Sequence, residues 1–383
     1  MKKITTITIT ILCSTLLFGS VFAKQGPKFS WDTVPLYAHF GATAGMSAEE
    51  IEFVATHYDF ITLEKAHGAK LHKGMTEPET FSDVAKIKAI NPDAHILFYW
   101  NLLLDYPMYQ MSKDRQSTDD WFIHTLDGKL HTKGKQKLKR YDLSNNDFQQ
   151  WWANSAKQAL EQGNMDGVFV DAIPQIGLVP KARIKDWGED KFTAIESGIN
   201  QTLAKLKATI GEDKTVIYNG VRSIPNGWNH GGNKYLKHTS GNIIEHFNVF
   251  QSQRPEQIAQ DLERMMTASK QGKITILKTW PGFTWLDKET LKLSKAELQR
   301  IAKEKITFPL AAFLIASGEK SYFNYTWGYR ENHGAYNWYP EFDKKLGEPL
   351  SDAKQEGFEY WREFKHVSVY LNIQTKKAEI KWR

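Results

Sequence analysis

The sequence predicts an α/β protein built on a (β/α)8 barrel, the TIM-barrel fold, with a small C-terminal β extension. Short apolar, β-branched or aromatic runs alternate with longer segments of helical periodicity along most of the 383 residues. The short runs are continuously apolar, which is typical of parallel strands buried on both faces. Eight such units in this length fit a closed barrel better than an open doubly wound sheet.

The expected strands are the eight runs at residues 34–40, 60–64, 94–100, 167–171, 215–219, 242–246, 274–278 and 321–325. Each run is rich in the residue types that favour strands. No Gly-rich dinucleotide-binding fingerprint follows the first run, and this disfavours a Rossmann-type sheet.

Helical segments separate these strands, and we expect helices at residues 47–57, 147–162, 192–210, 255–271 and 294–316. The first of them opens with Ser47 and has Glu50 three positions later, a pattern that resembles a capping box. The regular alternation of strand and helix indicates successive βαβ units, which make parallel sheets.

Residues 1–23 are expected to be a signal peptide. Lys2 and Lys3 precede an uncharged, largely apolar stretch that ends in a small-residue cleavage site after Ala23. The alternative is a retained membrane anchor, because the stretch approaches the length of a short span. Cleavage leaves a secreted or periplasmic chain with no membrane span and no cysteine, since Cys13 is the only one.

Within the catalytic barrel expected at residues 24–334, one segment departs from the repeat. A long insertion at residues 101–144 follows the third strand and contains a basic run at 130–140. This run either meets an anionic substrate or forms a solvated surface loop, and charge runs are usually the latter. After the barrel, the aromatic-rich segment 335–383 ends in two stretches that read as strands of the small β extension, at 367–372 and 377–382.

Composition narrows the class of partner. The net charge of +6 falls to +4 when the two lysines of the signal segment are removed. That mild excess disfavours nucleic-acid binding, which usually shows a denser basic footprint. Aromatic residues make up 13% of the chain, including 13 Trp and 15 Tyr. They serve either a large core or a site that stacks against sugar rings.

Two carboxylates carry the functional hypothesis. Asp171 and Glu245 each end an apolar strand, and catalytic groups of this fold lie at the carboxyl ends of strands. Glycoside hydrolysis needs two carboxyl groups beside the scissile bond, one protonated and the other ionised. The alternative is that these carboxylates form ion pairs with Lys278, Lys65 or Arg222 that merely hold the strand ends.

Other polar or aromatic side chains at strand ends are expected to bind substrate: His39, Glu64, Trp100, Asn101, Asn219, Lys278, Trp280 and Trp327. For Glu64, binding a sugar hydroxyl or tuning Asp171 is the expected role. The tryptophans either form the walls of sugar subsites or pack in the core.

Motifs of competing chemistries are missing from the sequence. No His-x-His pair follows the first strand, and there is no His-Glu-x-x-His, Gly-x-Ser-x-Gly or Walker A motif. A mature chain without cysteine excludes thiol catalysis. We therefore expect carboxylate chemistry with no cofactor and no metal.

Several segments resemble a bacterial group of glycoside hydrolases, the hypothetical glycosyl-hydrolase-like family fifteen: residues 166–171, 244–245, 338–343, 362–364 and 369–372. The resemblance implies a TIM barrel, a glycosidase activity and a small C-terminal β extension. α-Galactosidase-like and polygalactosaminidase-like barrels are similar in having an aspartate at the end of the fourth strand. By that similarity Asp171 would be the nucleophile or base, and Glu245 the proton donor.

The sequence thus predicts a secreted glycoside hydrolase that acts on a poly- or oligosaccharide. One rival is a barrel that binds carbohydrate without cleaving it. Another is a different barrel hydrolase such as a metal-dependent phosphodiesterase, for which the histidine spacing offers no clear metal cluster. The sugar, its anomer, the stereochemical outcome and the oligomeric state stay open.

Overall fold

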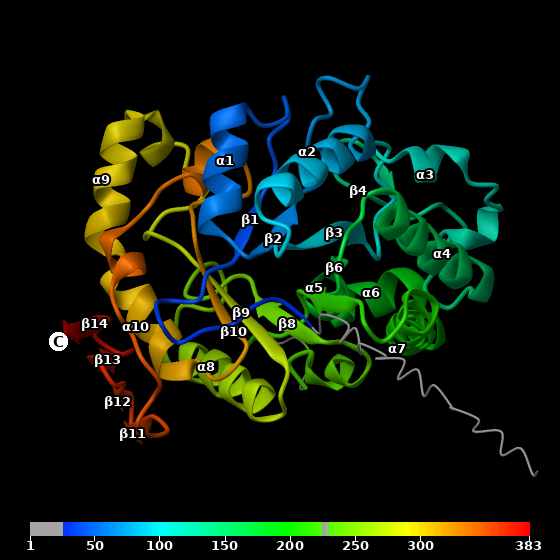
Figure 1. The fold of residues 1–383 in the computed structure, drawn as a ribbon. Coiled ribbons are helices and arrows are strands. Elements are labelled where there is room, and N and C mark those ends of the chain that lie inside the picture. The colour runs from blue at the N-terminus through cyan, green and yellow to red at the C-terminus, as the bar shows by residue number, and fades with distance from the viewer. Residues whose placement is uncertain (1–25, 224–227, 229) are drawn as a thin grey trace, which may run out of the picture.

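The centre of the molecule is a barrel of eight parallel strands. The computed structural model describes residues 26–223, 228 and 230–383; the expected signal peptide at 1–23 lies outside them. The strands follow one another in the order β1-β2-β3-β6-β7-β8-β9-β10 (Figure 1). They are β1 (Ala38–Phe40), β2 (Phe60–Leu63), β3 (His95–Asn101), β6 (Gly167–Asp171), β7 (Thr215–Tyr218), β8 (Gly241–Ile244), β9 (Ile274–Thr279) and β10 (Ser321–Tyr325). A parallel bridge between Leu36 and Phe323 joins β10 to the segment before β1. The predicted (β/α)8 barrel is confirmed.

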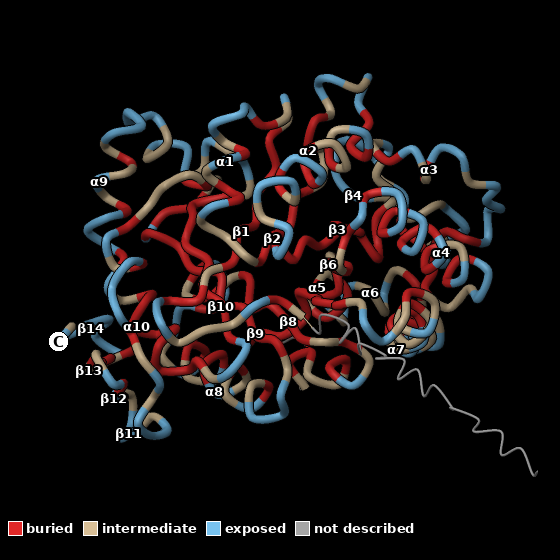
Figure 2. The backbone as a smooth tube through the Cα atoms, in the orientation of Figure 1, coloured by how far each residue is buried: buried red, intermediate tan, exposed pale blue. Residues whose placement is uncertain are grey.

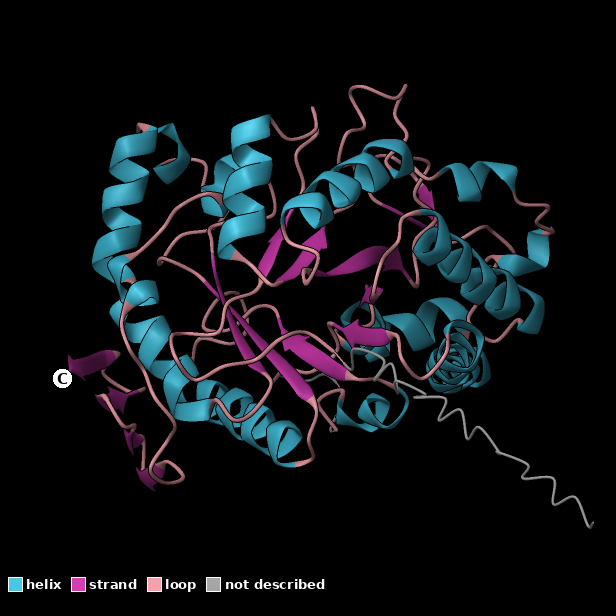
Figure 3. Ribbon diagram, in the orientation of Figure 1, coloured by secondary structure: helices cyan, strands magenta, loops and turns pink. Residues whose placement is uncertain are grey.

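Helices surround the strands (Figure 3). They are α1 (Ala48–His57), α2 (Glu77–Ile90), α4 (Asn146–Gln162), α5 (Pro174–Gly177), α6 (Pro180–Trp187), α7 (Glu189–Ile210), α8 (Pro255–Lys270), α9 (Lys295–Lys305) and α10 (Thr307–Ala316). The expected capping box begins α1, with the Ser47 hydroxyl and the Glu50 carboxylate each accepting the other's backbone N–H. None of the described helices is both long enough and apolar enough to cross a membrane.

The helix expected at 294–316 is in fact two helices, α9 and α10, which meet at Ile306. Pro309 explains the break. A proline ring clashes with the carbonyl group four residues earlier, and here that carbonyl belongs to Lys305, the last residue of α9. The new helix restarts with a bond from the N–H of Leu310 to the carbonyl of Ile306.

The insertion after β3 folds over the end of the barrel at which the carboxyl ends of the strands lie. It contains α3 (Gln110–Asp114) and a hairpin of β4 (Thr132–Lys133) and β5 (Leu138–Lys139). The basic run therefore forms this hairpin. Backbone bonds from Asp105 to Lys139 and from Tyr141 to Leu103 tie the hairpin to the residues just beyond β3.

The C-terminal segment is an antiparallel sheet of β11 (Lys354–Glu356), β12 (Glu359–Glu363), β13 (Val367–Asn372) and β14 (Lys377–Trp382). The sequence predicts β13 and β14 with these bounds and misses β11 and β12. The sheet packs on α10, whose residues from Pro309 to Ala316 are all buried. Figure 2 shows buried backbone running through the barrel strands and exposed backbone along the outer helices.

Candidate active site

Four polar side chains follow four barrel strands at the point where each strand ends. Asp171 is the last residue of β6, while Glu64, Asn219 and Glu245 directly follow β2, β7 and β8. The carboxyl ends of parallel strands lie at one end of the barrel. The two predicted catalytic carboxylates therefore belong to the same mouth.

Asn219 connects these two carboxylates. Its amide nitrogen Nδ2 donates one hydrogen bond to Oδ1 of Asp171 and a second, of 2.9 Å, to Oε2 of Glu245. Two hydrogen bonds from one nitrogen keep the accepting oxygens less than about 6 Å apart. Retaining glycosidases hold their carboxyl groups at roughly 5–5.5 Å, whereas inverting enzymes need about 6.5–9.5 Å. The arrangement matches the shorter spacing.

Two further donors face Asp171. The Tyr99 hydroxyl and Nδ2 of Asn101, the latter at 2.9 Å, both donate to Oδ2 of Asp171. The side-chain oxygen of Asn101 accepts from the backbone N–H groups of Leu103 and Leu104 at 3.0 and 2.7 Å, which fixes the orientation of the amide. Together with the bond from Asn219, these contacts hold the Asp171 carboxylate in one orientation.

Glu245 lies in a more buried setting than Asp171. Burial raises the pKa of Glu245 above its ordinary value, and the charge of Asp171 raises it further. Tyr329 is a hydrogen-bond partner of Glu245, and burial followed by the charge of this carboxylate raises the pKa of the Tyr329 hydroxyl. A carboxyl group that keeps its proton to higher pH is what a general acid requires.

Two side chains, His39 and Lys65, hold the carboxylate of Glu64 in place. Nε2 of His39 and Nζ of Lys65 lie 2.9 and 2.8 Å from its carboxylate oxygens. Burial alone would raise the pKa of Glu64, but the charge of Lys65 and the contact with His39 lower it to about 2. Glu64 is thus ionised throughout the neutral range. The Lys65 ammonium also lies 4.5 Å from the ring centre of Tyr99. The ion pair of Glu64 and Lys65 therefore lies beside Tyr99, one of the hydrogen-bond donors to Asp171.

Lys278, another predicted substrate contact, is fully buried. Its ammonium group donates to Asn324 Oδ1 at 2.9 Å, to Thr326 Oγ1 at 2.7 Å and to the carbonyl of Gly328 at 3.3 Å. These three bonds use all of its protons. Burial lowers the pKa of Lys278 to about 7, against the opposing charges of Glu245 and Glu64.

An aromatic wall, formed by His246, Trp280, Trp285 and Tyr329, stands beside Glu245. Ring centres lie 6.2 Å apart for His246 and Trp280, 5.2 Å for Trp280 and Trp285, and 4.9 Å for Trp285 and Tyr329. Burial lowers the pKa of His246 to about 3, so its ring is neutral. Trp280 thus lies at the mouth.

Trp100 and Trp327 lie elsewhere. The Trp100 indole donates to the carbonyl of Trp152 on α4 at 3.2 Å and packs against that side chain, between the barrel and its helix layer. Trp327 is buried in the loop after β10, against Phe283 and close to Gly334. The structure therefore brings His39, Glu64, Asn101, Asn219 and Trp280 together with Asp171 and Glu245, and leaves Trp100 and Trp327 outside that group.

Sequence reasoning did not select Tyr99 or Tyr329, and it named Lys65 only as a possible ion-pair partner of Asp171 and Glu245. A signal for Tyr99 exists, because it lies two residues before Asn101 and alternate residues of a strand share a face. Lys65 is visible as a charge directly after Glu64. Tyr329 lies in a loop beyond β10, and no pattern in the sequence connects it with Glu245.

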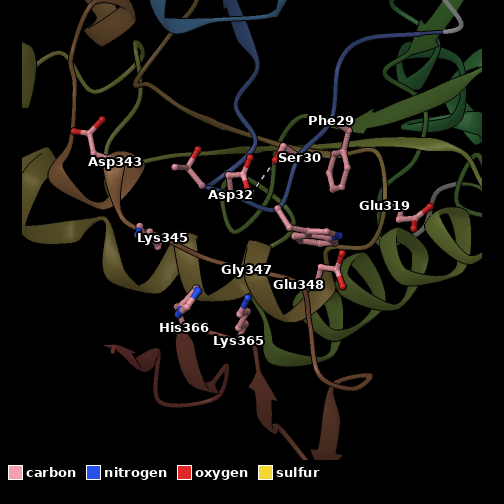
Figure 4. A pocket seen from close by; sticks show the side chains of 12 residues that line it. Phe29, Ser30, Asp32, Glu319, Asp343, Lys345, Gly347, Glu348, Lys365 and His366 are labelled. Atoms are coloured by element: carbon pink, nitrogen blue, oxygen red, sulfur yellow. Dashed lines mark hydrogen bonds between the residues drawn. The ribbon is translucent and has the colours of Figure 1, made fainter.

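A concavity lies at the other end of the barrel. It has a volume of about 910 Å³ and is lined by the residues before β1, the residue Glu319 near the start of β10, and the tail, as Figure 4 shows for Asp32, Lys365 and His366. It contains none of the residues around Asp171. Within the described part of the chain, no group of three or more His, Cys, Asp or Glu side chains is arranged to hold a metal ion.

The sequence model of hypothetical glycosyl hydrolase family 15 matches residues 88–368, well over half of the chain. None of the curated proteins matches the sequence.

Solved structures of carbohydrate-active enzymes are similar to this chain at low sequence identity. An α-xylosidase of Xanthomonas citri is 12% identical, with a TM-score of 0.51 over 81% of this chain and 34% of its own. A maltogenic α-amylase of Thermotoga neapolitana is 11% identical, with a TM-score of 0.48 over 90% of this chain and 86% of its own. A cycloisomaltooligosaccharide glucanotransferase of Paenibacillus is 13% identical, with a TM-score of 0.45 over 67% of this chain and 40% of its own. The chain thus spans well under half the length of the xylosidase and the glucanotransferase.

Proposed function

The chain belongs to hypothetical glycosyl hydrolase family 15, and from that premise we propose that it cleaves glycosidic bonds of a poly- or oligosaccharide with two carboxylates. Asp171 acts as the nucleophile and Glu245 as the general acid. Family membership supports a glycosidase activity. The assignment of the two roles is our inference from the local geometry.

One observation carries the proposal: Asn219 holds Asp171 and Glu245 on the two protons of a single amide. The resulting separation supports a retaining reaction. The environments of the two carboxyl groups differ in the direction that the reaction needs. Asp171 accepts hydrogen bonds from Tyr99 and Asn101, which orient it, whereas burial raises the pKa of Glu245 and favours its protonated form.

In the first step an oxygen of Asp171 attacks the anomeric carbon and forms a glycosyl ester, while the bond to the leaving sugar breaks. Glu245 gives its proton to the departing glycosidic oxygen, so the leaving sugar departs as a neutral alcohol. In the second step Glu245 takes a proton from water, whose oxygen attacks the anomeric carbon and releases Asp171. Each step inverts the anomeric carbon, so the overall configuration is retained.

Substrate contacts follow from the same mouth. We propose that Trp280, within the aromatic wall, stacks on a sugar ring, because sugars present apolar faces to indoles. The ionised carboxylate of Glu64 would accept a hydrogen bond from a sugar hydroxyl, and His39 orients that carboxylate. Asn101 and Asn219 act mainly by positioning the catalytic carboxylates, and Lys278, with its protons used internally, holds the loop after β10.

The test is hydrolysis of a panel of polysaccharides and aryl glycosides by the wild type and by Asp171→Asn, Glu245→Gln and Glu161→Gln. The first two changes are expected to lower kcat/KM by roughly 100- to 10,000-fold. Glu161 is an exposed carboxylate on α4 and serves as the matched control, with activity unchanged. NMR of the first-formed product should show the anomer of the substrate.

Full activity in both catalytic variants would refute the assignment of the pair. Product of the opposite anomer would refute retention while leaving hydrolysis intact. Tight glycan binding with no product from any substrate would favour the rival binding protein.

We also propose that the protein acts in the periplasm or outside the cell, after removal of residues 1–23. The observation behind this is the charged start, apolar stretch and small-residue end of that segment. N-terminal sequencing of the exported protein should begin at Lys24, and a mature chain that retains the segment would contradict the proposal.

A further inference from the structure

A basic pocket of about 280 Å³ opens beside the catalytic mouth. We define it by Lys133, Arg140, Arg183, Gln175, Val179 and Gln251, which line it. The hairpin after β3 supplies the first two of these residues. The segments that follow Asp171 and Glu245 supply the others, so the pocket is built by loops of the catalytic face.

Arg140 is the central group of the basic pocket. Only 3% of this residue is exposed, and neither Nε nor Nη1 has a hydrogen-bond partner among the described residues. Arg183 also has an unpartnered Nε, and its nearest carboxylate, Asp186, lies 3.7 Å away. Buried charged groups are normally paired and hydrogen-bonded, because desolvation is otherwise costly. The two guanidinium groups therefore have donors to spare.

The positive charges also repel one another. Burial lowers the pKa of Arg140 to about 10, and the charge of Arg183 contributes to this. Burial followed by the charge of Arg140 lowers the pKa of Lys133. Three cations gathered around one small space are stabilised when an anion enters it.

The basic pocket is close enough to the catalytic pair to act on the same substrate. Nζ of Lys133 donates to Oε1 of Gln175 at 2.5 Å, and the N–H of Gln175 bonds to the carbonyl of Ala172, the residue after Asp171. On the other side of the pocket, Arg222 donates to Oε1 of Gln251 at 3.3 Å. Asp171 itself acts electrostatically on Lys133. A sugar next to the cleaved one would reach this space.

We propose that the basic pocket is a subsite for an anionic substituent, a carboxylate or a sulfate ester, on a sugar of the glycan chain adjacent to the cleaved bond. The inference rests on the proposed function and adds that the substrate is an acidic glycan. Guanidinium groups suit this task, because their planar N–H donors match the paired oxygens of carboxylates and sulfates. Lys133 adds a point charge at the rim.

Binding to the full chain carrying Glu245→Gln, in which turnover is suppressed, tests the inference by calorimetry. The carboxylate arm compares tetragalacturonate with its methyl ester, and the sulfate arm compares a carrageenan tetrasaccharide with its desulfated form. The anionic member of at least one pair is expected to bind roughly 10- to 100-fold more tightly. The preference should weaken as salt is raised.

Arg140→Gln and Arg183→Gln, each added to that background, should abolish the preference, while Arg140→Lys should keep part of it. Lys135→Gln, on the exposed turn of the same hairpin, is the matched control and should leave it unchanged. Thermal unfolding of each variant shows whether it folds. If Arg140→Gln does not fold, Arg183→Gln and Arg140→Lys still decide the question.

Equal binding of charged and neutral forms, no binding of either anionic form, or a preference that survives both glutamine variants would overturn the inference. The arm with the larger preference identifies the anion as carboxylate or sulfate. Preferential binding together with no hydrolysis by the wild type would refute the proposed function alone. Hydrolysis of neutral glycans with no anion preference would refute the subsite alone.

Discussion

At the scale of single residues, the site depends on two glutamates that the same fold places in different environments. Glu64 contacts Lys65 and His39, and these contacts lower its pKa to about 2 against the effect of burial, so it stays ionised. Burial, followed by the charge of Asp171, raises the pKa of Glu245. Chemically similar groups are thereby assigned different protonation states at the same pH, as an acid and a charged ligand require.

The pH profile of kcat/KM should carry this difference. A general acid works only while protonated, so activity falls as pH rises through the pKa of Glu245. Because burial raises that pKa, the alkaline limb is expected above the pH at which an ordinary glutamate with a pKa of 4.5 would lose its proton. The residual activity of Glu245→Gln is measured with an aryl glycoside whose leaving group needs no proton. Its kcat/KM should show no such fall at alkaline pH.

The groups that face Glu245 include Lys278, and burial lowers the pKa of Lys278 to about 7, so its titration also falls on the alkaline side of the profile. Lys278→Met is the control for the profile. If the alkaline limb persists in Glu245→Gln and vanishes in Lys278→Met, the lysine and not the glutamate governs it.

At the scale of elements, close backbone approach sets how the helices meet the barrel. Gly198 lies in the middle of α7, where an alanine normally favours the helix. A Cβ atom at this position would lie 2.1 Å from the carbonyl oxygen of Leu143, just before α4. The contact is between backbones, so no side-chain rotation relieves it.

Gly198→Ala is therefore expected to lower the free energy of unfolding by about 1–3 kcal/mol, the usual effect of overpacking. Ser197→Ala, the exposed neighbour on the same helix, should change it by less than about 0.5 kcal/mol. Chemical denaturation of both variants measures the difference. A gain of stability in Gly198→Ala would show that α7 and the Leu143 loop can separate freely.

At the scale of the whole molecule, α10 belongs to the barrel and to the C-terminal sheet at once. Phe313 packs on Phe323 of β10 with ring centres 5.2 Å apart, and the sheet covers the helix from the other side. Arg362 of β12 donates to the carbonyl groups of Leu314, Ile315 and Ser317 at the C-terminus of α10. The carbonyl groups that end a helix need such partners.

We expect the barrel and the sheet to unfold in one cooperative transition, which Arg362→Met shifts to lower temperature as a unit. The loss should be about 2–4 kcal/mol, because buried carbonyl groups lose a charged donor. Arg300→Met on the exposed face of α9 is the matched control and should have little effect. Two separate transitions in calorimetry would contradict this linkage.

The sequence by itself determined the eight strands and the end of the barrel at which chemistry can occur. Continuous apolar runs mark strands buried on both faces, and the direction of the chain fixes which end of a parallel strand is the carboxyl end. Asp171 and Glu245 were identifiable for this reason. A search for apolar runs does not detect β11 and β12, because their residues are mostly polar. Their register is set only by pairing, of β12 with β13 and of β11 with β12.

Only the tertiary structure decided which face of each strand points inward. When both faces are apolar, the sequence cannot distinguish them, so Trp100 was predicted to bind substrate together with Asn101, while Tyr99 was not selected. The fold turns Tyr99 and Asn101 toward Asp171, and Trp100 toward α4. Contacts between distant loops, such as Asn219 between the two carboxylates or the clustered arginines of the basic pocket, likewise depend on barrel closure and not on any local pattern.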